Sequence, residues 1–182
     1  APFRRYPYAA PSRREGVAVL AGSFNPPHLG HLQMLTHLAA AHETVYAVIG
    51  VNPSKRYAVS AYERQELMRS MLQELGLDNV RVVVHAGIIW KFARSAGATV
   101  MYRGIRSWRL DGCPEKWLEL LNIVTQLGSG RCPLPTAYLQ ANPEFAAVSS
   151  TLLRGRVERR QDISHLVPPG CANAVTAAYS RR

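Results

Sequence analysis

The chain has 182 residues, of which 47% are hydrophobic and 19% charged, and its formal net charge is +10. This length suits one compact domain, and the composition is ordinary for a globular protein. No apolar run approaches the roughly 20 residues that cross a bilayer, and no secretory signal pattern is present, so we expect neither a membrane nor a secreted protein. Cys113, Cys132 and Cys171 form no CxxC pair, which disfavours a zinc site or a disulfide framework and favours a reducing, cytoplasmic compartment. The positive charge suits partners that carry phosphate.

The first sixteen residues differ in character from the remainder of the chain. Residues 1–16 are rich in Pro, Arg and Ala and show no periodicity, so we expect a flexible leader there. A single domain is expected over residues 17–182. Because the chain begins with Ala1 rather than Met, processing, excision from a longer polypeptide and the remnant of an organelle signal are all open.

Five short apolar runs follow in chain order, at residues 17–20, 45–49, 80–84, 98–101 and 136–139. Runs of this length are typical of parallel strands that are covered on both faces. Helices are expected between and after them, around residues 32–38 and at residues 61–75, 89–96, 115–127, 149–159 and 170–179. The second of these has clear ends, because Ser60 to Glu63 has the form of a capping box and Gly76 can take the left-handed conformation.

This alternation predicts an α/β fold with a doubly wound, Rossmann-like, five-stranded parallel sheet and helices on both faces. In such sheets, ligands bind beyond the carboxyl ends of the strands. The chemically informative stretches of this sequence follow predicted strands, so we expect them to lie at that edge.

The first such stretch is GSFNPPHLGH, which runs from Gly22 to His31 and joins the first strand to the first helix. Small residues there let backbone amides approach phosphate, and a helix start favours anions. His28 and His31 lie three residues apart and share one face of the incoming turn. Their imidazoles can donate hydrogen bonds to phosphate oxygens whose charge grows in a transition state. The alternatives are a proline turn with two surface histidines, or a metal site that lacks a third ligand.

Three further stretches carry phosphate-binding side chains. Lys55 follows the second strand in a proline turn and can act as a point charge. Arg103 and Arg106 flank Gly104 and Ile105 after the fourth strand, in what we expect to be a loop, and guanidinium forks suit paired phosphate oxygens. The hydroxyls of residues 149–151 open a late helix, where they form a phosphate site or simply cap the helix.

These strings resemble known families. The first is similar to the signature of the HxGH nucleotidyltransferase superfamily. NPSKRYAVSAYERQEL at residues 52–67, RGIR at residues 103–106 and the segment at residues 162–168 look like those of bacterial phosphopantetheine adenylyltransferases, and residues 148–154 resemble the ISSS or ISST motif of the superfamily. The resemblance covers about residues 17–178.

The resemblance implies a role for each matched residue. His31, Lys55 and Arg103 would be catalytic, with His31 stabilising the transition state. The acceptor would be bound by Ser23, Lys55, Ile88, Ile89 and Arg103. ATP would be bound by Ser23, Phe24, His28, His31, Gly104, Ile105, Arg106, Glu115, Phe145, Val148, Ser149, Ser150 and Thr151.

The implied reaction moves AMP from ATP onto 4′-phosphopantetheine and releases dephospho-coenzyme A and pyrophosphate, with Mg²⁺ on the triphosphate and no metal site of the protein's own. Homologous enzymes are commonly oligomeric, so a homo-oligomer is one expectation, whereas nucleic acid and membrane partners are not expected. The chain departs from the family pattern at Asn25, usually Asp, at His28, usually Thr or Asn, and over residues 107–114.

Other functions compete with this interpretation. A nicotinamide-nucleotide adenylyltransferase shares GSFNPPH-type starts and SST endings, but RGIR stands where its IGxD-like signal is expected. A cytidylyltransferase that uses CTP and a non-catalytic nucleotide-binding module of the same fold are further alternatives. A nucleic-acid binder rests on charge alone, since no helix-turn-helix, zinc-finger or aromatic RNA-binding motif supports it.

Overall fold

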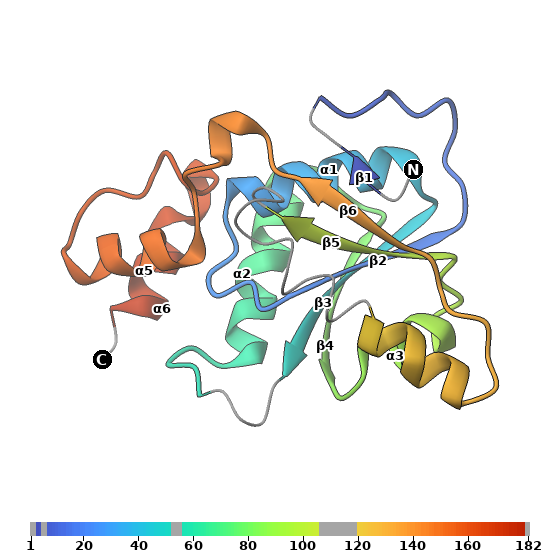
Figure 1. Cartoon of the computed structure of the whole chain (residues 1–182). Coiled ribbons are helices and arrows are strands. Elements are labelled where there is room, and N and C mark those ends of the chain that lie inside the picture. The colour runs from blue at the N-terminus through green and yellow to red at the C-terminus, as the bar shows by residue number, and fades with distance from the viewer. Residues whose placement is uncertain (1–2, 5–6, 52–55, 106–119, 181–182) are drawn as a thin grey trace.

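A computed structural model of the chain describes residues 3–4, 7–51, 56–105 and 120–180 (Figure 1). In chain order these residues form β1 Phe3–Arg4, β2 Val17–Gly22, α1 Leu29–Ala41, β3 Thr44–Val51, α2 Ala61–Glu74, β4 Val80–Ala86, α3 Ile89–Ser95, β5 Val100–Ile105, β6 Thr136–Gln140, the short 3-10 turn η1 Pro143–Phe145, α5 Ser150–Glu158, the 3-10 turn η2 Pro169–Cys171 and α6 Ala172–Tyr179. A further helix covers residues 120–128. None of the described helices combines the length and the apolar character that crossing a bilayer requires.

The strands form one parallel sheet in the order β1-β6-β5-β2-β3-β4. All five predicted strands are confirmed, and so is the doubly wound, Rossmann-like arrangement. A sixth strand extends the edge of the sheet, because Phe3 and Arg4 pair with Tyr138 and Leu139 of β6. The sequence did not predict this strand, which lies within the segment expected to be a leader.

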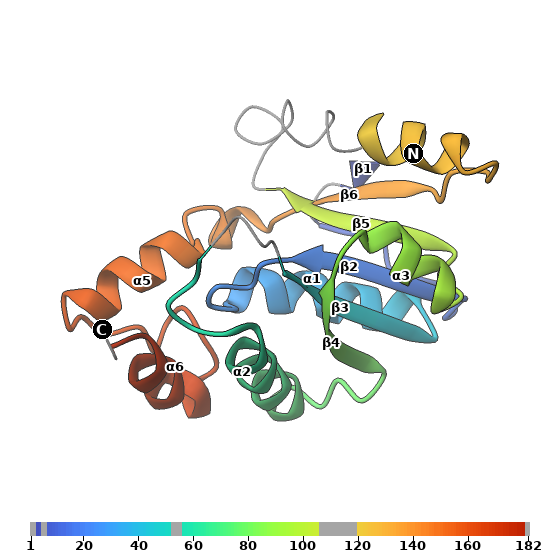
Figure 2. The ribbon, with the colours of Figure 1, turned by 90° about the horizontal axis from the view of Figure 1, so that it is seen from below.

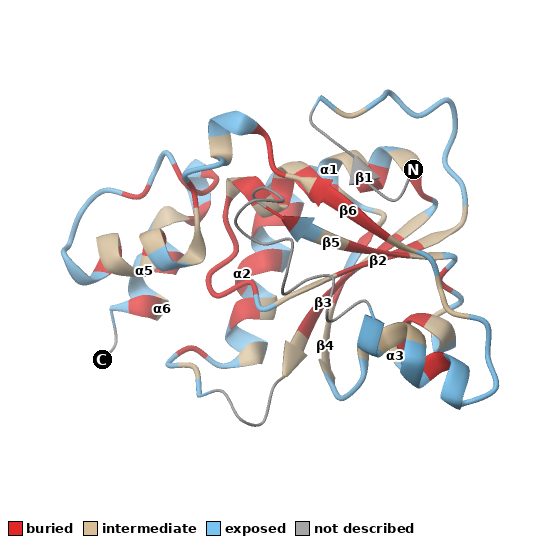
Figure 3. Cartoon of the chain, in the orientation of Figure 1, coloured by how far each residue is buried: buried red, intermediate tan, exposed pale blue. Residues whose placement is uncertain are grey.

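A second contact from the same segment involves Tyr8. Its ring stacks on His37 of α1 with the ring centroids 4.2 Å apart, and its hydroxyl donates a hydrogen bond of 2.7 Å to the carbonyl of Gln140 at the end of β6. Residues 9–15 are exposed (Figure 3). Both contacts of the segment therefore come before its exposed stretch.

Helices cover both faces of the sheet (Figure 2). α1 and α2 lie on one face, and α3 and the helix at residues 120–128 lie on the other. Consecutive residues of β2 explain the continuous apolar run, because side chains alternate between the two faces of a strand. Ala18 and Leu20 belong to the large core under α1 and α2, whereas Val19 packs with Trp90 under α3. The prediction of strands covered on both sides is thus confirmed.

The start of α2 has the predicted capping box. The Ser60 hydroxyl accepts a hydrogen bond of 3.2 Å from the amide of Glu63, and the Glu63 carboxylate accepts one of 3.0 Å from the amide of Ser60. Past the other end, Gly76 has φ +64°, the left-handed conformation expected there. The helix therefore begins and ends at defined residues.

Two predicted boundaries need correction. Arg103, Gly104 and Ile105 belong to β5 itself, where they pair with β6, and do not form a loop after the strand. The helix predicted over residues 115–127 is described from residue 120 and continues to residue 128, while residues 115–119 lie outside the described part of the chain.

Candidate functional site

The order in which successive strands join the sheet reverses its direction at β2. From β2 the chain adds β3 and β4 on one side, and it then crosses over to add β5 and β6 on the other. Adjacent connections diverge at such a switch point, which leaves a crevice at the carboxyl ends of the two central strands. A cavity of about 260 Å³ lies there on the face covered by α1. Its walls are Leu20, Ala21, Gly22, Phe24, His28, Gly30, His31, Met34, Gly104, Ile105, Ala141, Phe145, Val148, Ser149 and Ser150.

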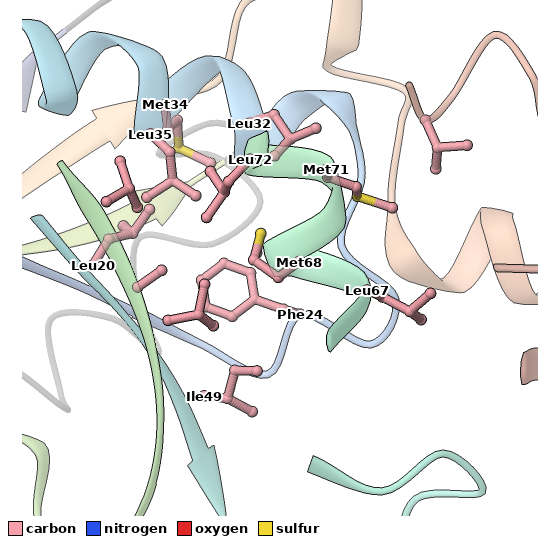
Figure 4. Close-up of a cluster of buried hydrophobic side chains, with 14 of the residues drawn as sticks. Leu20, Phe24, Leu32, Met34, Leu35, Ile49, Leu67, Met68, Met71 and Leu72 are labelled. Carbon is pink, nitrogen blue, oxygen red and sulfur yellow. The ribbon is translucent and has the colours of Figure 1, made fainter. Parts of the chain in front are cut away.

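Residues 24–28 of the loop after β2 are buried (Figure 3), and the side chain of Phe24 lies in the core (Figure 4). Phe24 has φ +44°, and the left-handed region costs a non-glycine residue about 1–2 kcal/mol. Its ring is only 2% exposed and lies in the core near Leu20 and Met68. A Cβ at Gly22 would stand 3.1 Å from the ring, so this position has no room for a side chain unless the ring moves.

The two predicted histidines meet at the start of α1. The rings of His28 and His31 stack with their centroids 3.7 Å apart and an interplanar angle of 29°. The ring of Phe24 meets His31 edge-on, with 4.9 Å between the centroids. The Nδ1 atoms of both imidazoles are buried and have no hydrogen-bond partner among the described residues. Buried polar atoms normally have a partner, so these imidazoles are suited to receive one from a ligand.

Burial also sets the charge of this pair. It lowers the pKa of His28 from 6.5 to about 4. Burial lowers the pKa of His31 as well, and repulsion from His28 lowers it further. Both rings are therefore neutral at neutral pH, and each neutral imidazole has one N–H donor and one acceptor. A phosphate close to the rings would favour their protonated forms and raise both pKa values.

The start of α5 forms another part of the cavity wall. The Ser149 hydroxyl accepts a hydrogen bond of 3.1 Å from the amide of Leu152, so this residue caps the helix. The Ser150 hydroxyl donates a hydrogen bond of 2.7 Å to the carbonyl of Pro26 in the loop after β2. The predicted capping by Ser149 is thus confirmed, and its role at a phosphate stays a prediction. Ser150 ties α5 to the loop.

Ser23 of the loop and Thr151 of α5 border a second space next to the cavity. They line a more polar hollow of about 390 Å³ together with Arg56, Tyr57 and Arg154. Thr151 accepts a hydrogen bond of 3.2 Å from Arg154. Since Ser150 borders both spaces, the hollow and the cavity are neighbours.

Three of the predicted acceptor residues, Ile88, Ile89 and Arg103, lie on the side of the sheet that α3 covers. Arg103 and Ile89 line a small cavity of about 20 Å³ under α3, away from the face that carries His31. Ile88 caps the start of α3 and is 44% exposed. Ala21 borders both this cavity and the larger one. The predicted site residues therefore lie on both faces of the sheet, and the two cavities that they line meet at the end of β2.

Lys55, Arg106 and Glu115 lie outside the described residues. The structure thus brings together the predicted ATP-binding residues at one cavity, namely Phe24, His28, His31, Gly104, Ile105, Phe145, Val148, Ser149 and Ser150. It places Ser23 and Thr151 in the adjoining hollow.

Sequence reasoning gave no role to three side chains that hold the loop after β2. Arg64 donates through Nη1 to the carbonyl of Ser23, and Arg154 donates through Nη1 to the carbonyl of Asn25. The Tyr179 hydroxyl donates a hydrogen bond of 2.6 Å to Oδ1 of Asn25. Burial raises the pKa of Tyr179, so its hydroxyl stays protonated and able to donate.

A signal for Arg64 was present in the sequence. The apolar face of α2 carries Leu67, Met68 and Met71, and helical spacing places Arg64 on that same face. An arginine on the buried face of a helix needs partners for its N–H groups. Tyr179 has no comparable signal, because it lies 154 residues from its partner.

The strand order and its switch-point cavity define an α/β domain of the Rossmann-like class. Residues 19–156 match the model of the cytidylyltransferase-like family. The phosphopantetheine adenylyltransferase of Mesorhizobium japonicum is 34% identical to the chain over 171 residues, which are 92% of this chain and 99% of that protein. That of Treponema pallidum is also 34% identical, over 90% of this chain and 98% of its own. That of Rhodopirellula baltica is 35% identical over 82% and 79%. The chain belongs to the cytidylyltransferase-like family and, within it, to the phosphopantetheine adenylyltransferases.

Proposed function

We propose that the chain is an adenylyltransferase that moves AMP from ATP onto 4′-phosphopantetheine and releases dephospho-coenzyme A and pyrophosphate. The observation that carries this proposal is the pair of stacked imidazoles, with buried Nδ1 atoms, in the switch-point cavity of a chain whose relatives bear that name. The proposal rests on chemistry as well as on kinship, because these rings lie where the fold class binds nucleotides.

In this proposal, ATP occupies the cavity on the α1 face. Gly104, Ile105, Phe145 and Val148 offer an apolar wall for the adenine. The phosphates lie toward His28, His31 and the start of α5, where backbone amides favour anions. Ser23 and Thr151 would then contact the phosphates from the adjoining hollow. Arg106 and Glu115 are further ATP ligands by resemblance.

The acceptor approaches from the α3 face. Arg103 and Lys55 would hold its phosphate, with Ser23 between the two substrates, and Ile88 and Ile89 would line its pantetheine arm. A phosphate oxygen of the acceptor attacks the α-phosphorus of ATP, the bond from this phosphorus to the bridging oxygen breaks, and pyrophosphate leaves. Positioning and charge stabilisation suffice for this in-line transfer, so no covalent enzyme intermediate is needed.

Histidine 31 would act on the charge that develops during transfer. An imidazole N–H aimed at the α-phosphate stabilises the extra negative charge of the pentacoordinate state. His28 would support His31, because the two rings stack in the same cavity and a phosphate bound there would interact with both. Burial strengthens such an interaction, since water screens it less.

Magnesium is expected to arrive with ATP as part of the substrate. Among the described residues, no carboxylate lines the cavity and no group of three His, Cys, Asp or Glu side chains is placed to hold a metal ion. Mg²⁺ prefers oxygen ligands and keeps several waters, so phosphate oxygens would hold it. The cytoplasmic location and the homo-oligomer expected from the sequence stay predictions.

The direct test supplies the purified chain and magnesium with ATP and one of two acceptors, phosphopantetheine or nicotinamide mononucleotide, or with no acceptor. Pyrophosphate release and product mass are measured. We expect dephospho-coenzyme A with phosphopantetheine and no product in the other two reactions. Formation of NAD would contradict the proposal in favour of a nicotinamide-nucleotide enzyme. CTP in place of ATP tests for a cytidylyltransferase.

The role of the imidazole is tested with His31→Ala. We expect kcat to fall by about 100- to 1,000-fold, the cost of losing a donor to a developing oxyanion. His165→Ala is the matched control, because His165 is exposed and lies far along the chain in the loop before α6. Unchanged kcat in a folded His31→Ala variant would show that this ring has no part in the transfer.

A further inference from the structure

One buried cation lies behind the loop that carries the candidate site. Arg64 is 2% exposed, and burial lowers its pKa while the phenols of Tyr179 and Tyr57 oppose this effect. Its guanidinium lies 4.6 Å from the centre of the Tyr57 ring. A buried guanidinium is costly unless its N–H groups donate hydrogen bonds. Nε donates to the carbonyl of Ser60 at 3.3 Å, and Nη1 donates to the carbonyl of Ser23.

The second of these hydrogen bonds acts on the strained residue of the loop. The Ser23 carbonyl belongs to the peptide unit that enters Phe24, so fixing its direction restrains φ of Phe24. That angle is +44°, which a bulky residue rarely adopts. A strained angle of this kind persists only where its surroundings hold it. Arg64 supplies that restraint, because its hydrogen bond holds the peptide unit that precedes the N–Cα bond of Phe24.

The restraint reaches the imidazole through one ring contact. Phe24 is buried and its ring meets that of His31 at 4.9 Å and an interplanar angle of 74°. Rotation of the peptide between residues 23 and 24 would move this ring and open space beside His31. The His31 ring also stacks on His28, but its Nδ1 has no hydrogen-bond partner among the described residues, so ring contacts position it.

Other hydrogen bonds hold residues 25 and 26 of the loop, whereas Arg64 holds the carbonyl of Ser23. Arg154 and Tyr179 bind Asn25, and Ser150 binds the carbonyl of Pro26. These contacts would persist without Arg64. The peptide between Ser23 and Phe24 would then be released at one end while residues 25 and 26 stay in place.

We propose that Arg64 is a positioning residue for the transfer reaction. It acts through the Ser23 carbonyl and the ring of Phe24 to hold the His31 imidazole in place for its contact with the α-phosphate. The inference rests on the proposed function for its kinetic consequence. Its structural consequence, a coupled movement of Phe24 and His31, does not depend on which substrates the chain uses.

Arg64→Ala tests this inference, with Arg69→Ala as the matched control. Arg69 lies on the exposed side of the same helix, where it pairs with Glu66 at 2.6 Å. We expect Arg64→Ala to lower kcat by about 10- to 100-fold, the scale of a misplacement near 1 Å, with a smaller change in KM for ATP. Guanidinium chloride at low concentration should restore part of the loss, and sodium chloride at equal concentration should not. Arg69→Ala should behave as the unsubstituted chain does.

A second measurement follows the loop itself. In NMR spectra, the three-bond coupling between the amide and α protons of Phe24 reports its φ, and the ring nitrogen shifts of His31 report its surroundings. Both should change in Arg64→Ala and stay unchanged in Arg69→Ala. Where Arg64→Ala does not fold, Arg64→Lys is used, because its donors all lie on one nitrogen and it lacks the separate Nε and Nη1 donors with which Arg64 reaches the two carbonyls.

Each outcome decides the matter. Lowered kcat together with altered Phe24 coupling and altered His31 shifts supports the inference. A folded variant in which turnover, the Phe24 coupling or the His31 shifts stay unchanged overturns it. If the unsubstituted chain transfers no AMP, the proposed function fails, and the inference is then decided by whether the Phe24 and His31 signals change together.

Discussion

Acidification should destabilise this fold through the buried histidine pair, and His28→Asn isolates the effect. The unfolded chain takes up a proton on His28 below pH 6.5, whereas the folded chain resists it until about pH 4. The stability that a neutral His28 provides is therefore complete above pH 6.5 and is lost as the pH falls toward 4. At about 1.4 kcal/mol per pH unit and proton, this shift corresponds to about 3 kcal/mol. His31 acts in the same direction.

The assay is urea-induced unfolding of the chain and of His28→Asn at several pH values between 7 and 4. The free energy of unfolding of His28→Asn should fall less steeply with acidification, by about 3 kcal/mol over the whole range. His165→Asn is the control, because that side chain is 52% exposed and its ion pair with Asp162, at 3.7 Å, contributes little. Parallel curves for the chain and His28→Asn would refute the claim that His28 is buried in its neutral form.

Three further substitutions probe the site. Tyr179→Phe removes the donor to the buried Oδ1 of Asn25, so the free energy of unfolding in urea should fall by about 1–3 kcal/mol. Gly104→Val places side-chain atoms in the cavity, where even a Cβ would lie 2.7 Å from Cε of Met34; calorimetric ATP affinity should fall by about tenfold or more. Arg103→Ala should raise KM for the acceptor by about tenfold and leave KM for ATP nearly unchanged, as steady-state kinetics would show.

The fold was predictable where the pattern along the chain is local. The run over residues 17–20 predicts a strand covered on both sides, and the structure bears this out because Val19 and Leu20 face different helices. The capping box at Ser60 likewise needs only four residues in sequence. β1 could not be predicted, because its pairing with β6 joins Phe3 to a residue more than 130 positions away.

The site was predictable in part for the same reason. The stretch from Gly22 to His31 follows a strand and opens a helix, so its place at the edge of the sheet follows from the fold class. The face on which Arg103 lies was missed, because its stretch was expected to be a loop. Once Arg103 and Gly104 are known to belong to β5, the alternation of side chains puts them on opposite faces.

Contacts that hold the site from behind depend on tertiary structure. Arg64 reaches Ser23 across 41 residues, and Tyr179 reaches Asn25 across 154. No local period or motif links such partners. Tertiary packing brings Arg64 of α2 and Tyr179 of α6 to the loop after β2.

A crystal structure of the chain with dephospho-coenzyme A, the proposed product, tests the central claim most directly. The adenine should lie in the cavity on the α1 face, against Gly104 and Phe145, with the newly formed diphosphate beside His31. The pantetheine arm should pass Ala21 toward Arg103 on the α3 face. An adenine bound under α3, or a product bound away from both histidines, would contradict the account.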